Sequence, residues 1–264
     1  MPALTVKDLL ASKGQRKLTQ VNVHDPREAR ACEEAGIDMI ITWERSPIRE
    51  FRAAAPGTFF TVGLVYGTYV NADEAKRAAF DAMEKGADAI YCPMGLDVVE
   101  ALAREAIPVH GHVGFVPYKR TWTGGFKAVG KTADSAIEVY KRAKAYEDAG
   151  AIAIEVELVP VPVATEITKR LSILTVAMGA GSGCDAQYLF AKDILGYNDG
   201  HVPRHAKSYR DHGAEYRRLY DDSVAAFAEF KSETEAETFP AQGNVLGMKE
   251  AELDAFQAAV EKLG

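Results

Sequence analysis

Short apolar runs alternate with longer amphipathic runs along nearly the whole chain. The short runs are rich in β-branched residues and have the length of strands. Nearly continuous apolar runs such as DMIIT and AIAIEVEL are typical of a parallel sheet that is covered on both faces. The pattern predicts strands at Leu18–Val23, Asp38–Thr42, Thr58–Val65, Asp88–Cys92, Pro108–Val113, Ala151–Glu157 and Ile173–Met178, and a short eighth strand at Asp193–Gly196.

The longer runs have helical spacing and carry signals for helix boundaries. They include PREARACEEAG, NADEAKRAAFDAMEKGA and TADSAIEVYKRAKAYEDAGA. Asp25 can cap the first of these helices with Pro26 in its first turn, and Gly36 can end it. Asn71 and Thr132 are the corresponding caps of the other two.

Strands that alternate with helices indicate βαβ units and a parallel sheet. No GxGxxG follows the first strand, where a doubly wound dinucleotide fold would carry one. The 264 residues suit one barrel. The predicted fold class is therefore α/β, a (β/α)8 TIM barrel with a C-terminal helical extension.

The last part of the chain has a different character. A long charged helix, RDHGAEYRRLYDDSVAAFAEFKSE, precedes a connection with Pro and Gly and a final helix from Lys249. We predict one barrel domain over residues 1–264, with 208–264 as a C-terminal helical appendage that packs on the barrel or on a neighbouring subunit.

The composition narrows the choice of partners. The net charge is −7, from 38 acidic and 31 basic residues, which argues against nucleic acid or an anionic membrane and favours a small-molecule ligand. Cys32, Cys92 and Cys184 are too few and too scattered for a disulfide framework. No signal peptide and no membrane-length apolar stretch is recognised, so we expect a cytoplasmic protein.

Candidate chemistry follows from the rule that barrel active sites lie at the carboxyl ends of the strands. Glu157 ends an apolar strand and precedes VPVP, so we expect it to be partly desolvated. A desolvated carboxylate is a competent proton acceptor near neutrality. Glu155 faces the same side of that strand and would titrate together with Glu157. The alternative is that salt bridges satisfy both carboxylates.

Two histidines share one face of the fifth strand. His110 and His112 flank Gly111 in PVHGHVG, and the glycine allows another group to approach closely. The pair could contact substrate or ligate a metal, although no HxxEH or HExxH pattern is present. Hydrogen-bonded core histidines are the alternative interpretation. The GAGSG run at 179–183 is interpreted as a tight turn from a strand to a helix.

Several stretches between residues 105 and 212 resemble ketopantoate hydroxymethyltransferases. They are IPVHGHVGFVP, TGGFKAVGKT, the ELVPVPVATEIT run, VAMGAGSGCDAQYLFAKDILG and GHVPRHAK, with nearly the family's spacing. The resemblance implies the (β/α)8 fold of the phosphoenolpyruvate mutase and isocitrate lyase superfamily. It also implies proton removal from C3 of a 2-oxo acid, hydroxymethyl transfer from methylenetetrahydrofolate, a Mg²⁺ ion and a homo-oligomer. Glu157 then stands at the general-base position and His112 at a substrate-contacting position.

The N-terminal half departs from the family pattern where the metal would bind. The run TWERS replaces the family's GDS motif and places Glu44 at its aspartate. Gly63 and Pro93 stand where the resemblance implies a second aspartate and a glutamate, and Tyr91 replaces a lysine. The loop after this motif is shortened to SPIREFRAAAPG.

Two routes to a stabilised enolate stay open. A divalent cation could bind through Glu44, His24 or Asp25 together with substrate. Otherwise Arg45, with His112, replaces the metal as a cationic clamp. The residues expected at the substrate are the strand-end side chains Arg45, Ser46, Tyr66, Tyr91 and His110.

The sequence therefore predicts an enzyme that makes or breaks a carbon–carbon bond next to a 2-oxo acid, through an enolate and with Glu157 as base. The one-carbon donor would be methylenetetrahydrofolate or formaldehyde. One alternative is a superfamily lyase or hydrolase that acts on another small carboxylate with an altered metal site or none. A second is a non-catalytic barrel that serves in binding or assembly.

Overall fold

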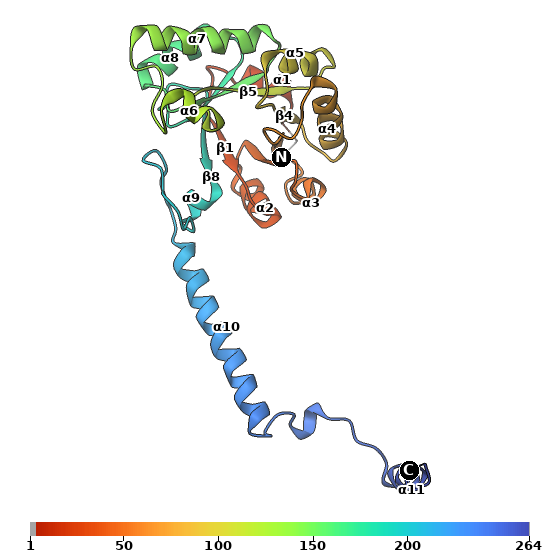
Figure 1. Ribbon diagram of the computed structural model, residues 1–264. Coiled ribbons are helices and arrows are strands. Elements are labelled where there is room, and N and C mark those ends of the chain that lie inside the picture. Colours follow the sequence, from red (N-terminus) through yellow and green to blue (C-terminus); the bar gives the residue numbers. More distant parts are fainter. Residues whose placement is uncertain (1–3, 264) are drawn as a thin grey trace. The chain divides into compact units, whose positions relative to one another are not determined.

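Eight parallel strands close into a barrel in the computed structural model, which describes residues 4–263 (Figure 1). Each strand pairs with the next along the chain, and β8 pairs with β1. This confirms the predicted (β/α)8 fold. The strands are β1 (Leu18–Asn22), β2 (Met39–Trp43), β3 (Phe59–Gly63), β4 (Ala89–Tyr91), β5 (Val109–Gly114), β6 (Ala153–Glu157), β7 (Leu174–Met178) and β8 (Ala186–Phe190).

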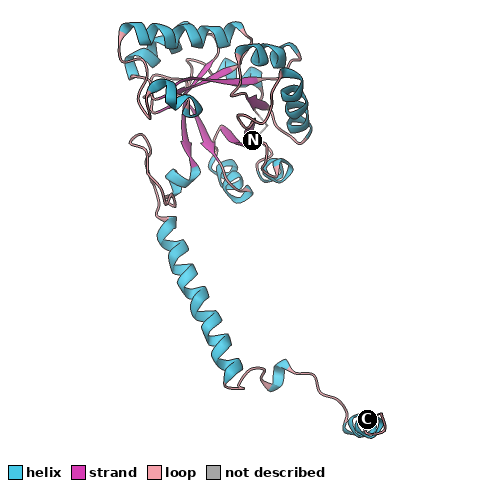
Figure 2. Cartoon of the chain, in the orientation of Figure 1, coloured by secondary structure: helices cyan, strands magenta, loops and turns pink. Residues whose placement is uncertain are grey.

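Helices follow the first six strands and cover the outside of the barrel (Figure 2). These are α2 (Pro26–Ala35), α3 (Ile48–Ala54), α4 (Ala72–Glu84), α5 (Leu96–Arg104), α7 (Ala133–Asp148) and α8 (Val161–Arg170). Shorter elements are α1 (Val6–Ala11), the 3₁₀ turn Pro117–Lys119, α6 (Arg120–Thr123) and α9 (Ala191–Leu195). The predicted caps form: the Asp25, Asn71 and Thr132 side chains each accept a backbone N–H of the first turn.

The eighth strand lies earlier in the chain than the sequence pattern predicted. Residues 193–196 belong to α9 and its cap, and the strand is Ala186–Phe190. Gly196 ends α9 in the left-handed conformation, with φ 72°. The apolar residues near Asp193 are therefore the end of a short helix. Residues 179–185, which include GAGSG, join β7 directly to β8, so the helix expected after this turn is absent from the described chain.

Alternation along the strands separates two apolar cores. Side chains such as Leu18, Met39, Phe59 and Leu174 fill the inside of the barrel, whereas the larger cluster packs between the strands and the helices. The amino-terminal end of the barrel is thus closed by apolar side chains. The polar side chains collect at the other end.

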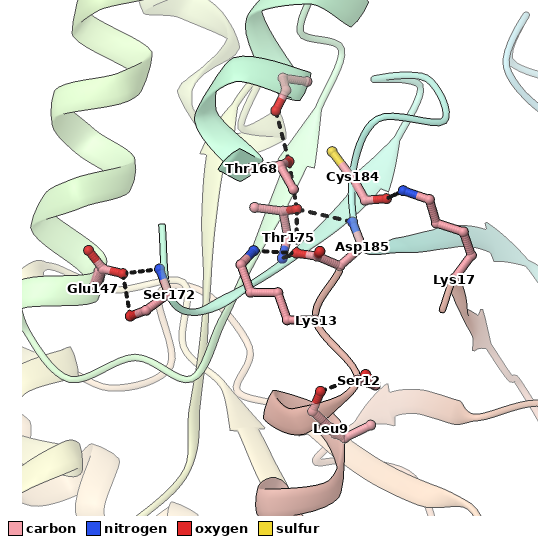
Figure 3. A network of polar contacts seen from close by, with 11 residues as sticks. Leu9, Ser12, Lys13, Lys17, Glu147, Thr168, Ser172, Thr175, Cys184 and Asp185 are labelled. Carbon is pink, nitrogen blue, oxygen red and sulfur yellow. Dashed lines mark hydrogen bonds and ion pairs between the residues drawn. The ribbon is translucent and has the colours of Figure 1, made fainter. Parts of the chain in front are cut away.

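A buried aspartate holds together the start of β8 and the elements around it (Figure 3). Asp185 is 5% exposed and accepts hydrogen bonds from the backbone N and Oγ1 of Thr175, both at 2.9 Å. Lys13 Nζ lies 2.7 Å from its carboxylate. The Thr175 hydroxyl is in turn 2.8 Å from that of Thr168 on α8. The Asp185 carboxylate therefore joins the chain after α1 to β7, and through Thr168 to α8.

We expect Asp185→Asn to lower the free energy of unfolding by about 2–4 kcal/mol, because it leaves Lys13 unpaired and places an amide N–H group against donors. Urea unfolding monitored by circular dichroism measures the change. Glu34→Gln, which breaks the exposed Arg30–Glu34 pair, should cost no more than about 0.5 kcal/mol. An equal loss in both variants would contradict the role assigned to Asp185.

The chain divides into two compact units, one up to Asp211 and one from His212. The second unit contains α10 (His212–Glu235), the 3₁₀ turn Gln242–Asn244 and α11 (Glu250–Val260), so the long charged helix and the final helix form as predicted. Large apolar side chains of α10 are exposed, among them Leu219, Val224 and Phe227. Within residues 4–263, no helix is both long enough and apolar enough to cross a membrane.

Candidate active site

A cavity of about 1410 Å³ opens at the carboxyl ends of the strands. Its walls come from most of the strand ends and from the loop that follows α9. They include Trp43, Tyr66, Tyr91, His112, Glu155, Glu157, Met178, Phe190 and His205. Most of this lining is aromatic or apolar. Its two carboxylates lie on β6 beside His112 of β5, and the basic side chains Arg45, His201, Arg204 and His205 also line it. The cavity is larger than a small keto acid alone requires.

Glu157 is the last residue of β6 and lies in the cavity wall with 8% of its surface exposed. Its backbone carbonyl accepts the N–H of Phe115 at 2.8 Å, which fixes the strand end against β5. The next residue, Leu158, has φ 49°, a left-handed conformation that is uncommon for a bulky side chain. Such backbone strain occurs where the surrounding structure holds a functional group in place.

The His112 ring lies between Tyr91 and Glu157, and each of its two nitrogens contacts one of them. Its Nδ1 is 2.8 Å from the hydroxyl of Tyr91, and its Nε2 is 3.1 Å from Oε2 of Glu157. The Glu157 oxygen lies off the N–H axis, so Nε2 makes no aligned hydrogen bond to any described residue. Burial lowers the pKa of His112, but the charges of Glu155 and Glu157 and the contact with Glu157 outweigh it and raise the pKa. The imidazole can thus carry a proton between these carboxylates.

Glu155 is a second carboxylate in the same wall. It is 4% exposed, and its Oε1 lies 4.0 Å from His112 Nε2. Burial raises its pKa from 4.5 to about 7; the charge of His112 opposes this shift, and the charge of Glu157 adds to it. The two carboxylates face the same side of β6, as predicted.

His110 lies deeper in the barrel and does not line the cavity. Burial, together with the charge of His112, lowers its pKa to about 3, so it is neutral at physiological pH. Gly111, between the two histidines, faces outward, and a Cβ there would overlap the ring of Tyr146 on α7. The close approach that the sequence pattern indicated is therefore made by an outer helix.

Three other predicted substrate contacts lie around the cavity. Arg45, Ser46 and Tyr66 all belong to its lining. The Arg45 Nη2 donates to Thr68 at 3.3 Å. Tyr66 stacks on Tyr118, with ring centroids 3.9 Å apart. The Arg45 guanidinium is the cation that the sequence predicts near the substrate.

The predicted metal candidates lie outside the cavity lining and are engaged elsewhere. Glu44 accepts a hydrogen bond from the Tyr69 hydroxyl at 2.7 Å. Asp25 caps α2, and His24 lies 3.5 Å from the carboxylate of Glu28. These side chains do not converge on a common point in the cavity. The residues present therefore do not fit a Mg²⁺ ion at the position that the resemblance implied.

The indole of Trp43 occupies the space beside Gly63, one of the positions where the resemblance implied a metal-binding aspartate. A Cβ at Gly63 would lie 2.8 Å from Cε3 of Trp43, so the ring fills the space that a side chain at position 63 would need. Trp43 also meets Tyr91 edge to face, with the ring centroids 6.2 Å apart. Trp43 and Tyr118 are not among the site residues predicted from the sequence, although the place of Trp43 at the end of an apolar strand is a usable signal.

Comparison with known proteins identifies the family. The family model described as ketopantoate hydroxymethyltransferase matches residues 47–242. The chain belongs to this family. A 3-methyl-2-oxobutanoate hydroxymethyltransferase of Deinococcus radiodurans is 35% identical, over 96% of this chain and 95% of the relative. A protein of the same name from Thermus thermophilus is 34% identical, over 85% of this chain and 94% of that one.

Solved structures share the fold at low identity. A phosphonopyruvate hydrolase in complex with oxalate and Mg²⁺ is 16% identical, covers 98% of this ketopantoate hydroxymethyltransferase family member and 99% of its own chain, and gives a TM-score of 0.51. The carboxyl transferase domain of Rhizobium etli pyruvate carboxylase with 3-bromopyruvate is 12% identical and gives a TM-score of 0.54. This match covers 72% of this chain and 42% of that one. These likenesses support the barrel fold alone.

The titration of Glu155 makes stability depend on pH. Because its folded pKa of about 7 exceeds 4.5, its contribution to stability is fully present below pH 4.5 and is lost as the pH rises through 7. We expect the stability of the wild type relative to Glu155→Gln to fall by on the order of 3 kcal/mol between pH 4.5 and 8. Urea unfolding in chelator at both pH values measures this difference, and a constant difference would refute it.

Proposed function

We propose that this protein transfers a hydroxymethyl group to the carbon next to the carbonyl of a 2-oxo acid. The observation that carries the proposal is the placement of Glu157 in the cavity wall, beside an imidazole that Tyr91 holds in position. Membership in the family supports the reaction class.

In the first step, Glu157 removes a proton from C3 of the keto acid. The C–H electron pair forms the C2–C3 double bond, and the carbonyl electrons move to the keto oxygen. His112 stabilises the developing oxyanion by donating a proton or a hydrogen bond. Tyr91 keeps the imidazole oriented through Nδ1. Arg45 binds the substrate carboxylate as a charged clamp.

In the second step, C3 of the enolate attacks a carbon at the oxidation level of formaldehyde, from methylenetetrahydrofolate or from formaldehyde itself. With formaldehyde, the new C–C bond forms as the C=O π bond breaks, and the oxygen takes up a proton to become the hydroxyl group. With methylenetetrahydrofolate, both C–N bonds of the methylene carbon break, each nitrogen takes up a proton, and a water molecule supplies the hydroxyl oxygen. A cavity of about 1410 Å³ offers room for both reactants. Because Glu44, His24 and Asp25 do not fit Mg²⁺, no step is assigned to an ion there.

The setting of the enzyme is also part of the proposal. The exposed apolar side chains of α10, such as Leu219 and Phe227, support a homo-oligomer in which another copy covers them. The cysteines Cys32, Cys92 and Cys184 are free thiols, which is consistent with a reducing cytoplasm. The substrate is a small molecule, and neither nucleic acid nor a membrane is a partner.

We expect Glu157→Gln to slow C3 proton exchange into D₂O by about 10²–10⁴-fold, because the amide cannot accept the proton. One-dimensional NMR of a panel of 2-oxo acids measures the exchange. Glu166→Gln, on the exposed side of α8, is the matched control and should exchange at the wild-type rate. Exchange at that rate in Glu157→Gln would exclude this base. Turnover that consumes no one-carbon unit would instead support a lyase or hydrolase.

Replacing Arg45 with Met should raise KM for the keto acid by about 10–100-fold while changing kcat much less, because a charge-assisted contact to the carboxylate is lost. Steady-state kinetics with several 2-oxo acids measure the two constants. Arg45→Lys should recover part of the loss, since it keeps the charge without the bidentate geometry. Arg49→Met, which removes an exposed pair with Glu84, is the control. An unchanged KM in Arg45→Met would contradict the assignment of Arg45 as the residue that binds the substrate carboxylate.

A further inference from the structure

Three potential metal ligands lie together in the cavity wall. Ligand atoms of His112, Glu155 and Glu157 all lie within 4.8 Å of one another, and all three residues are buried. They come from adjacent strands: His112 is paired in register with Glu155, and Gly114 with Glu157. Neighbouring strands of a rigid barrel thus hold the three groups, so little reorganisation is needed to gather them around one ion.

A second observation separates this cluster from an ordinary group of acidic side chains. His112 is 4% exposed and lines the cavity, and its Nε2 lies 3.1 Å from Oε2 of Glu157 without making an aligned hydrogen bond to any described residue. A buried polar atom without an aligned hydrogen bond is costly unless it binds water, a proton or an ion. The other nitrogen is held by the Tyr91 hydroxyl, which orients the ring as outer partners orient metal-ligating histidines.

The charge of the cluster also calls for a cation. Ionised Glu155 and Glu157 carry two negative charges, and a protonated His112 compensates only one of them. Among the ion pairs of residues 4–263, neither carboxylate is paired with a lysine or arginine. A divalent cation would neutralise the pair and leave His112 in the neutral form that coordinates metals.

We infer that this protein binds one divalent transition-metal cation through His112 Nε2 and one oxygen each of Glu155 and Glu157. An imidazole with two carboxylates suits Zn²⁺, Co²⁺ or Mn²⁺ better than Mg²⁺, which prefers oxygen ligands only. Three protein ligands leave an open position that faces the cavity. The site is separate from Glu44, where the family pattern implied a metal, and binding at it does not require the proposed reaction.

Coordination also affects the carboxylate assigned as base. An oxygen of Glu157 bound to a cation is a weaker proton acceptor, so the cation and the C3 proton compete for the same group. The loaded protein should therefore exchange C3 protons more slowly than the protein kept in chelator. This consequence rests on the proposed function, whereas binding itself does not.

The test is a titration of the full-length, chelator-treated protein with Co²⁺, followed by its visible absorption. We expect one equivalent to bind, with a Kd that excess Mg²⁺ leaves unchanged. Glu155→Gln should weaken binding by at least about tenfold, and Glu44→Gln should bind as the wild type does. Failure of the wild type to bind Co²⁺, or loss of binding in Glu44→Gln with retention in Glu155→Gln, would overturn the assignment.

Two further measurements keep the test decisive. Zn²⁺ should raise the melting temperature of the wild type but not of Glu155→Gln, and Glu157→Gln removes another ligand if Glu155→Gln does not fold. Equal or faster proton exchange in the loaded protein would exclude Glu157 as a ligand. If Co²⁺ binds but C3 proton exchange is absent with and without chelator, the proposed reaction is refuted and the cation site stands. If exchange occurs but Co²⁺ does not bind, the cation site is refuted and the proposed reaction stands.

Discussion

The contact between His112 and the two glutamates of β6 is the interaction around which the rest of the site is arranged. A closed parallel barrel directs alternate side chains of every strand inward and brings all the carboxyl ends to one mouth. On β5 and β6 the inward positions carry four ionisable groups. Water solvates them poorly, so each must be neutral or be compensated by a neighbour. The neutral His110, the raised pKa values of His112 and Glu155 and the hydrogen bond of Tyr91 all follow from this requirement.

Most of the architecture could be predicted from the sequence because β-strands and helices alternate with clear boundary residues. The first seven strands and the caps at Asp25, Asn71 and Thr132 were predicted correctly. The eighth strand was misplaced because GAGSG resembles a turn into a helix, whereas here it leads straight into Ala186–Phe190. A local pattern indicates that the chain turns. It does not indicate which element follows.

The site was predicted in part, and the limits have physical causes. Strand-end position identified Glu157, His112, Arg45 and Tyr91, all of which line one cavity. Asp25 shows the opposite case: one carboxylate could cap a helix or bind a metal, and the helix was the nearer partner. The Trp43 ring on β2 packs against Gly63 on β3. Because the contact joins two strands, neither residue alone indicated that an indole fills the space beside Gly63.

The packing of Tyr146 on Gly111 links the chemistry to the outer shell of the molecule. The phenol ring of Tyr146 on α7 packs against the β5 backbone at Gly111, between the two histidines. The position of β5 therefore depends on this helix as well as on the side chains inside the barrel. Natural variation on this helix would then be constrained by the alignment of the imidazole with its carboxylates, and not by folding alone. The buried face of an outer helix is in this way part of what positions the reactive groups.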